Sequence, residues 1–289
     1  MDRPLILRLS ERATQPLSLV GGKAKNLMRL AETGIPIPPG FCVTTEAYRA
    51  FVARNNLERV ITDSLRDLRD GDRAAQASAA ARIQEAFCNG ILPTDVVEAL
   101  GKHYEELSER QADGLPVAVR SSATAEDLSD ASFAGIQKTL LNVRGLHAVT
   151  DALRNCWASL WTQQVVSYRS RMGITNADLA IAVIVQKMIP SRVAGVLFTI
   201  EPVTGDRSCF TVEACWGLGE ALVSGNTDPD HYELDRATFR LRNQIYGRQY
   251  HAVQCADGGG VRTVPVPDRR AVAHVSMQNN SRLWRERDF

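Results

Sequence analysis

The sequence predicts an α+β protein of two lobes, with helices concentrated in its first part and strands in its last part. From about Thr45 to Glu109 the residue pattern is helical, and from Ala180 onward short apolar runs indicate successive strands. A helical part followed by a sheet-rich part is typical of α+β architecture. We predict an N-terminal lobe with a helical insertion (1–185), a C-terminal lobe (186–265) and a divergent, truncated tail (266–289).

The first forty-five residues predict strand, helix and strand in that order. Leu5 to Leu9 has the pattern of a strand, and the Gly21-Gly22 pair interrupts the chain before a helix from about Ala24 to Glu32. Three prolines between residues 36 and 39 forbid a helix and make a stiff connector. A strand around Cys42 to Thr44 follows, before the helical stretch begins.

The middle of the chain predicts two strands and a long helical segment. Val117 to Val119 is a short apolar run that indicates a buried strand, and Lys138 to Val143 is a second strand. Residues from Leu146 to about Arg171 are helical, with Trp157 and Trp161 facing the core. The predicted strands of the last part are Ala180–Gln186, Val193–Thr199, Cys209–Cys215, His231–Leu234, Phe239–Ile245 and Gln249–Val253.

Composition excludes several classes of protein. The 289 residues carry a formal charge of +1, so no global field points to nucleic acid or an anionic membrane as a partner. The six cysteines are dispersed without a C-x-x-C pair, which indicates reduced thiols. The N-terminus lacks the pattern of a signal peptide, and polar residues interrupt the apolar stretch from Leu179 to Ile200. We therefore expect a soluble cytoplasmic protein.

The segment from Val117 to Gly135 reads V-A-V-R-S-S-A-T-A-E-D-L-S-D-A-S-F-A-G. It delivers one arginine, Arg120, from a strand into a loop of hydroxyls and small residues. Such a segment can present a cation to a phosphate chain, with Ser121, Ser122 and Thr124 as additional hydroxyl donors. The composition of the segment is equally consistent with a Ser-rich surface turn.

Lys23 is a second candidate for phosphate binding, because it follows the glycine pair at a helix start. On position alone, a surface lysine is an equally good interpretation. Other nucleotide-binding patterns are absent from the sequence, including G-x-x-x-x-G-K-[ST], G-x-G-x-x-G after a strand, and the H-R-D and D-F-G motifs of protein kinases.

The run R-S-S-A-T-A-E-D-x-x-x-A-S-F-A-G resembles the ATP-binding domain of the phosphoenolpyruvate synthase and pyruvate phosphate dikinase family, an ATP-grasp fold. The same domain occurs in rifampin phosphotransferases. Further segments are similar to other signatures of the family, in the same order, between about residue 19 and about residue 235. They are L-V-G-G-K-A-K-N-L (19–27), G-I-P-I-P-P-G-F-C-V-T-T (34–45), Q-K-M-I-P-S-R-V-A-G-V-L-F-T (186–199), W-G-L-G-E-A-L-V-S-G (216–225) and D-P-D (228–230).

The resemblance implies ATP and Mg²⁺ as cofactors, bound in a cleft between two lobes. It implies catalytic, phosphate-contacting roles for Lys23 and Arg120, and places Gly135 and Thr139 near the phosphates. Gln186 falls where the family contacts the adenine, and an amide can both donate to and accept from a base edge.

Three further residues carry side chains of the types that occur in catalytic regions. Glu201 and Glu220 are weaker candidates that could equally be solvated loop carboxylates. His231 is better interpreted as structural, because the family carries its phosphate-relaying histidine on a separate domain with its own signature.

The reaction implied by the resemblance converts ATP, pyruvate and water to phosphoenolpyruvate, AMP and phosphate through a phosphohistidine. The alternatives are the ATP-binding domain of a rifampin phosphotransferase and a non-catalytic fragment or pseudoenzyme. Beyond about residue 265 the chain departs from the family. The family has an acidic D-x-E-W motif there, followed by a Q-x-R-P motif, and the resemblance implies that these residues hold magnesium. Neither motif is found in this chain. We therefore assign no metal ligand and expect turnover to require phosphohistidine and pyruvate-binding domains supplied in trans.

Overall fold

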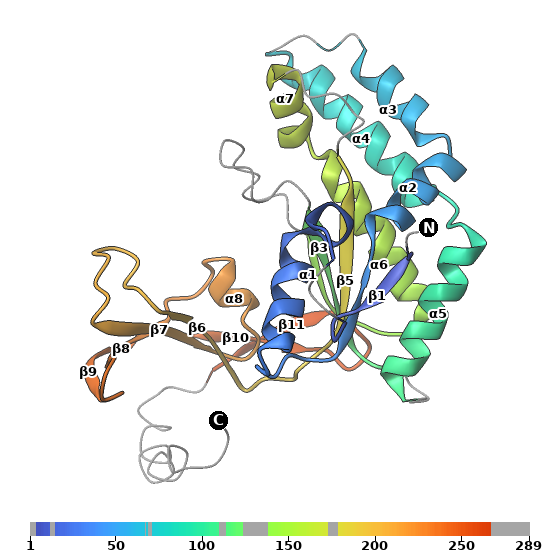
Figure 1. Cartoon of the computed structure of the whole chain (residues 1–289). Helices are drawn as coiled ribbons and strands as arrows, with labels where there is room; N and C mark the ends of the chain where they lie inside the picture. The colour runs from blue at the N-terminus through green and yellow to red at the C-terminus, as the bar shows by residue number, and fades with distance from the viewer. Residues whose placement is uncertain are drawn as a thin grey trace. The chain divides into compact units, whose positions relative to one another are not determined.

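The computed structural model describes residues 4–11, 15–66, 68, 71–109, 114–123, 138–172 and 179–266, without the side chains of 169–172. The chain forms two compact units, Met1–Ile189 and Pro190–Phe289 (Figure 1). In the described part of the chain, no helix is long and apolar enough to cross a membrane. The fold is α+β, as the sequence predicts.

The first unit is built on a five-stranded antiparallel sheet (Figure 1). In spatial order its strands are β1 (Ile6–Arg8), β2 (Gly40–Val43), β5 (Ile181–Lys187), β3 (Val117–Ala123) and β4 (Thr139–Val143). The central strand β5 is apolar on both faces, and successive side chains alternate between two separate cores. Ile181 and Val183 point to one core, whereas Ala182 and Ile184 point to the other.

Helices cover both faces of this sheet. They are α1 (Leu17–Glu32), α2 (Thr45–Arg54), α3 (Leu57–Leu65), α4 (Arg73–Asn89), α5 (Thr94–Ser108), α6 (Leu146–Ala158), a 3₁₀ turn (Ser159–Trp161) and α7 (Gln163–Met172). The larger core contains fully buried Trp157 and Trp161 and joins the sheet to helices α2 to α6. The smaller core lies between the opposite face and α1, through residues such as Val20, Ala24 and Met28.

The second unit contains a four-stranded antiparallel sheet and a hairpin. The sheet has the order β6 (Val193–Phe198), β7 (Cys209–Trp216), β8 (Asp230–Asp235) and β9 (Leu241–Ile245). A short helix α8 (Glu220–Val223) follows β7, and the hairpin consists of β10 (His251–Cys255) and β11 (Val261–Pro265). The backbone N–H of Leu218 donates to the oxygen of Val253 (2.8 Å), which fastens the hairpin to the loop before α8.

Two features of this arrangement differ from the sequence prediction. The strand expected at Ala180–Gln186 exists as β5, but it is the central strand of the first sheet and does not open a separate sheet-rich part. The strand β11 was not predicted at all. In the first case the cause is a pairing between segments far apart in sequence, which the local pattern does not encode.

Candidate functional site

Arg120 projects from β3 onto the α1 face of the first sheet. Its partner in the antiparallel register with β5 is Ile184, whose side chain belongs to the core beneath α1. Directly opposed residues in antiparallel strands share a face of the sheet. The Arg120 side chain is half-buried, so the sheet fixes its base while its guanidinium has partial access to solvent.

Ser122 connects this face to the segment that contains Lys23. The Ser122 hydroxyl donates to the backbone oxygen of Val20 (2.9 Å) and accepts from the backbone N–H of Ala24 (3.2 Å). Ser122 lies two residues after Arg120 on β3 and therefore on the same face. The two hydrogen bonds thus hold residues 20–24 against the strand that carries Arg120.

Gly21 allows this close approach. Its backbone has φ +74° and ψ 169°, which interrupts α1, so the continuous helical segment begins at the glycine pair. A Cβ atom at Gly21 would lie 2.2 Å from the backbone oxygen of Ser122, where no side chain fits. The predicted break at the glycine pair is confirmed, and its physical cause is contact between two backbones.

Thr139 and Gln186 lie on the same face. Thr139 of β4 is the direct register partner of Arg120, and it is exposed. Gln186 of β5 lies two residues beyond Ile184 on the same face, is buried, and donates through Nε2 to the backbone oxygen of Pro38 (2.9 Å). Four of the five residues proposed from the sequence are therefore placed on one side of one sheet.

Two residues of the Arg120 segment, Thr124 and Gly135, lie outside the described residues. Ser122 was a possible phosphate donor on its sequence, but in this structure its hydroxyl donates to the backbone oxygen of Val20. Ser121 lies on the opposite face, where its Oγ accepts from the backbone N–H of Lys138 (3.0 Å). The Oγ atoms of both serines therefore form hydrogen bonds with backbone groups of the protein itself.

The weaker candidates Glu201 and Glu220 lie in the second unit, as does His231. The Glu201 carboxylate accepts hydrogen bonds from the Thr204 hydroxyl (2.6 Å) and from the backbone N–H of Val203 (3.0 Å). These bonds, the Thr204 hydroxyl first, hold the pKa of Glu201 below its ordinary value. Glu220 is the first residue of α8, and His231 lies 3.5 Å from the Glu233 carboxylate on the same strand.

The described residues do not provide a metal centre of their own. Within the ranges given above, no group of three or more His, Cys, Asp or Glu side chains could hold a metal ion.

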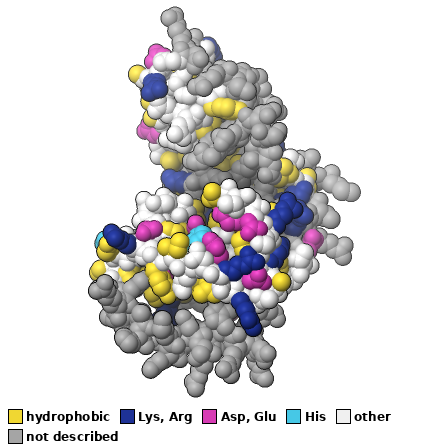
Figure 2. All heavy atoms as spheres, turned by 90° about the vertical axis from the view of Figure 1, so that its left-hand side faces the viewer, with side chains coloured by type: hydrophobic (Ala, Val, Ile, Leu, Met, Phe, Trp, Pro, Cys, Tyr) yellow, Lys and Arg dark blue, Asp and Glu magenta, His cyan; other side chains and the backbone are white. Residues whose placement is uncertain are grey.

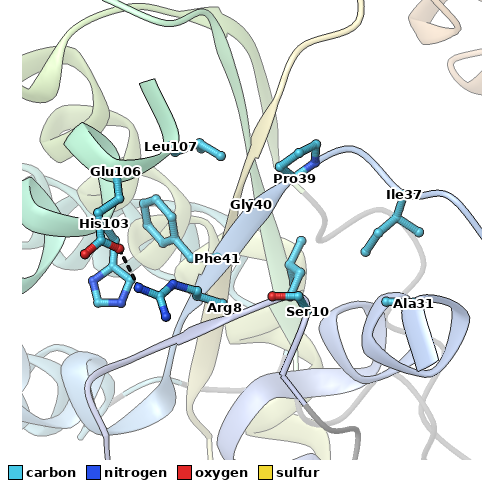
Figure 3. Close-up of a pocket in the computed structure, with 11 residues that line it drawn as sticks. Arg8, Ser10, Ala31, Ile37, Pro39, Gly40, Phe41, His103, Glu106 and Leu107 are labelled. Carbon is cyan, nitrogen blue, oxygen red and sulfur yellow. Dashed lines mark hydrogen bonds and ion pairs between the residues drawn. The ribbon is translucent and has the colours of Figure 1, made fainter. Parts of the chain in front are cut away.

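A cavity of about 330 Å³ lies beside the edge strand β1 of the first unit (Figure 3). Arg8 and Glu106 form an ion pair of 2.7 Å at its rim, next to His103 and Phe41, while Ile37 lies across the cavity. Its lining does not include Lys23, Arg120, Thr139 or Gln186.

The surface charge has no dominant sign on the face shown in Figure 2, where basic and acidic side chains of the described residues are intermingled with hydrophobic ones. This pattern agrees with the net charge of +1.

The mixed α+β architecture is that of an ATP-grasp-type domain, and a family match supports this class. The family model described as "Pyruvate phosphate dikinase, AMP/ATP-binding domain" matches residues 17–284. The chain belongs to this family.

Curated relatives include enzymes of two kinds. A probable phosphoenolpyruvate synthase of Staphylothermus marinus is 41% identical over 246 residues, which cover 84% of this chain and 30% of the relative. A rifampicin phosphotransferase of a Streptomyces species is 42% identical over 276 residues, which cover 93% of this chain and 31% of the relative. The chain thus spans about a third of the length of these relatives.

Proposed function

We propose that ATP binds on the α1 face of the first sheet, with its phosphates contacted by Lys23 and Arg120. Thr139 and Gly135 contribute near the phosphates, and Gln186 contacts the adenine. The observation that carries this proposal is the pair of Ser122 hydrogen bonds, which tie the Lys23 segment to the strand of Arg120. Lys23 and Arg120 are both half-buried, and they come from segments far apart in sequence that these hydrogen bonds hold together.

The proposed chemistry is phosphoryl transfer. In such reactions the protein mainly positions the phosphates and neutralises the charge that develops on their oxygens. Arg120 offers a planar fork of donors on a rigid strand, and Lys23 offers a point charge at the start of a helix. When bound, Mg²⁺ would supply further neutralisation of the phosphate charge.

Titration calorimetry with ATP tests the site. We expect Lys23→Ala and Arg120→Ala each to weaken binding by about tenfold or more, because a charged hydrogen bond contributes roughly 1.5–3 kcal/mol. Lys25→Ala, two residues away in α1, and Arg82→Ala on the exposed surface of α4 are the matched controls. Unchanged affinity in both site variants would refute the assignment.

We further propose that the complete enzyme is of the phosphoenolpyruvate synthase type and passes phosphate through a histidine outside this chain to pyruvate. The support is the 41% identity to a probable phosphoenolpyruvate synthase of Staphylothermus marinus. The similar identity of the rifampicin phosphotransferase keeps that acceptor as the second candidate. Assay of the native protein for AMP formation with pyruvate or with rifampicin distinguishes the two.

A further inference from the structure

The two serines that follow Arg120 form hydrogen bonds with different segments of the chain. They can do so because β3 continues through Ala123 and its successive side chains alternate between the two faces of the sheet. Ser121 is hydrogen-bonded to Lys138, in front of β4. Ser122 is hydrogen-bonded to both ends of the segment Val20–Ala24. Each serine therefore fixes the backbone of another segment beside Arg120.

Ser122 has no exposed surface, and its hydroxyl is enclosed by the chain it holds. The hydroxyl hydrogen goes to Val20, and one lone pair accepts from Ala24, so the side chain spans the kink at Gly21. The Gly21 backbone packs directly on the backbone oxygen of Ser122. Lys23 lies inside this clamped segment, one residue before Ala24.

We propose that Ser122 is a positioning residue for nucleotide binding, which holds Lys23 at the face of Arg120 and does not itself contact phosphate. The inference rests on the proposed role of Lys23. Without the hydroxyl, the backbone of residues 20–24 loses its two side-chain hydrogen bonds to β3. Lys23 is then ordered only when ATP binds, and the free energy of ordering it lowers the affinity.

The magnitude of this effect is estimated on the basis that the equivalent of one of the two lost hydrogen bonds is used to order Lys23. A hydrogen bond contributes about 0.5–1.5 kcal/mol net, which corresponds to a change in affinity of roughly two- to tenfold if it is used to preorganise the site. This effect is distinguishable from that of a direct phosphate contact, because it acts only through Lys23.

A double-mutant cycle measured by calorimetry with ATP tests the proposal. We expect Ser122→Ala to weaken ATP binding roughly two- to tenfold in the wild-type background, and to have no further effect in the Lys23→Ala background. Ser159→Ala is the control, since Ser159 is a buried serine in the same unit whose hydroxyl donates to Cys156 (2.7 Å), away from the site. It should lower stability without changing affinity.

The other outcomes separate the two proposals. Equal weakening by Ser122→Ala in both backgrounds means that Ser122 acts independently of Lys23, and it overturns the positioning role. No weakening in the wild-type background also overturns it, while leaving the site itself intact if Lys23→Ala still binds poorly. Unchanged affinity in Lys23→Ala removes the proposed role of Lys23 and this inference with it. If Ser122→Ala does not fold, Ser122→Cys, whose thiol is a weak donor, takes its place in the same cycle.

Discussion

Gly21 and Ser122 meet backbone to backbone, at a point where a single added carbon has no space. The conformation of Gly21 lies in the region of positive φ that glycine adopts readily and other residues do not. Gly34, just beyond the end of the same helix, also has positive φ but has nothing within 4 Å of an added Cβ. A side chain at Gly34 therefore meets only a conformational penalty, whereas one at Gly21 meets a steric clash as well, in a backbone region that is essentially restricted to glycine.

We expect Gly34→Ala to lower the free energy of unfolding by about 1–2 kcal/mol, which is the usual penalty for positive φ. Gly21→Ala should lower it by a further 1–3 kcal/mol or so, since the Ser122 backbone must move to make room. Urea denaturation followed by tryptophan fluorescence measures both. Equal losses in the two variants would contradict the contact between Gly21 and Ser122.

Among the elements of the second unit, buried Asp230 fastens the segment 247–249 to the sheet. Its Oδ1 accepts from the backbone N–H of Gly247 (3.0 Å) and from Nε2 of Gln249 (3.1 Å). Gln249 in turn accepts from the backbone N–H of Trp216 (2.9 Å) and donates to the oxygen of Ala214 (3.1 Å). The D-P-D signature thereby has a structural explanation.

Asp230→Ala should destabilise the protein by about 1.5–3 kcal/mol, because hydrogen bonds to a charged acceptor are lost and a buried donor remains unpaired. The control Asp257→Ala removes a carboxylate from the exposed hairpin turn and should change stability by less than about 0.5 kcal/mol. Thermal unfolding followed by circular dichroism measures the difference. A similar midpoint for both variants contradicts the fastening role.

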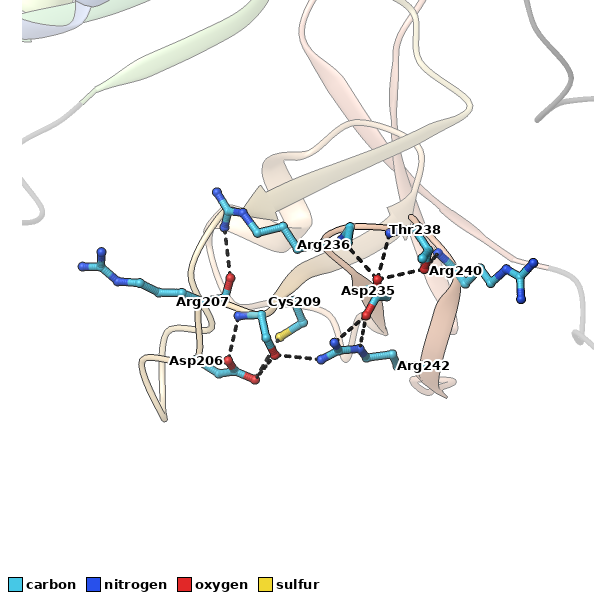
Figure 4. Close-up of polar contacts among 10 residues, drawn as sticks. Asp206, Arg207, Cys209, Asp235, Arg236, Thr238, Arg240 and Arg242 are labelled. Atoms are coloured by element: carbon cyan, nitrogen blue, oxygen red, sulfur yellow. Dashed lines mark hydrogen bonds and ion pairs between the residues drawn. The ribbon is translucent and has the colours of Figure 1, made fainter.

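Asp235 closes the turn between β8 and β9 (Figure 4). Its carboxylate accepts from the hydroxyl of Thr238 (2.8 Å) and from two nitrogens of Arg242 (3.1 and 2.5 Å). The Thr238 hydroxyl is the largest cause that holds the pKa of Asp235 well below its ordinary value, followed by Arg242. The charged form is therefore favoured in the folded state.

A depressed pKa gives stability that is complete above the ordinary Asp pKa of about 3.9 and is lost as the pH falls through and below it. We therefore expect Asp235→Asn to be less stable than the wild type at pH 7, with the difference shrinking between about pH 5 and pH 2. Unfolding curves at a series of pH values test this. A difference that stays constant or grows on acidification shows that the carboxylate is not stabilised by folding.

The sequence predicted the individual elements better than their pairing. The strands at β1, β2, β4 and β5 follow from local apolar runs and turn residues. The residue pattern singled out Lys23 and Arg120, and the resemblance favoured phosphate contact over a surface position for both. The roles of Ser121 and Ser122 were missed because the strand was expected to end at Val119, whereas β3 continues to Ala123. Only the longer strand sends the two serines to opposite faces. The backbone contact at Gly21 depends on a neighbour about a hundred residues away, which no local pattern contains.

At the scale of the whole molecule, both units contain cysteines, so the reactivity of the thiols measures the accessibility of both. All six cysteines are free, and four of them are buried, two in each unit. Burial raises the pKa of Cys156 to about 12 and that of Cys42 further still. Cys88 is exposed on α4, and Cys255 is partly exposed.

We expect N-ethylmaleimide to label Cys88 first and Cys255 more slowly in the native protein, because the thiolate is the reactive form and must be accessible. The four buried cysteines should react only after denaturation. Peptide mass spectrometry of a labelling time course identifies the sites. Early labelling of Cys42 or Cys156 would show that the first unit opens locally.

The central place of β5 in the first sheet has a consequence for the order in which the chain folds during synthesis. β5 pairs with β2 on one side and β3 on the other, yet it is the last strand of that sheet to leave the ribosome. Until residues 181–187 emerge, β2 and β3 each lack a neighbour, and unpaired strand edges promote association between chains. Nascent chains that stop before this point should therefore depend on chaperones, and the sheet forms late, through contacts distant in sequence.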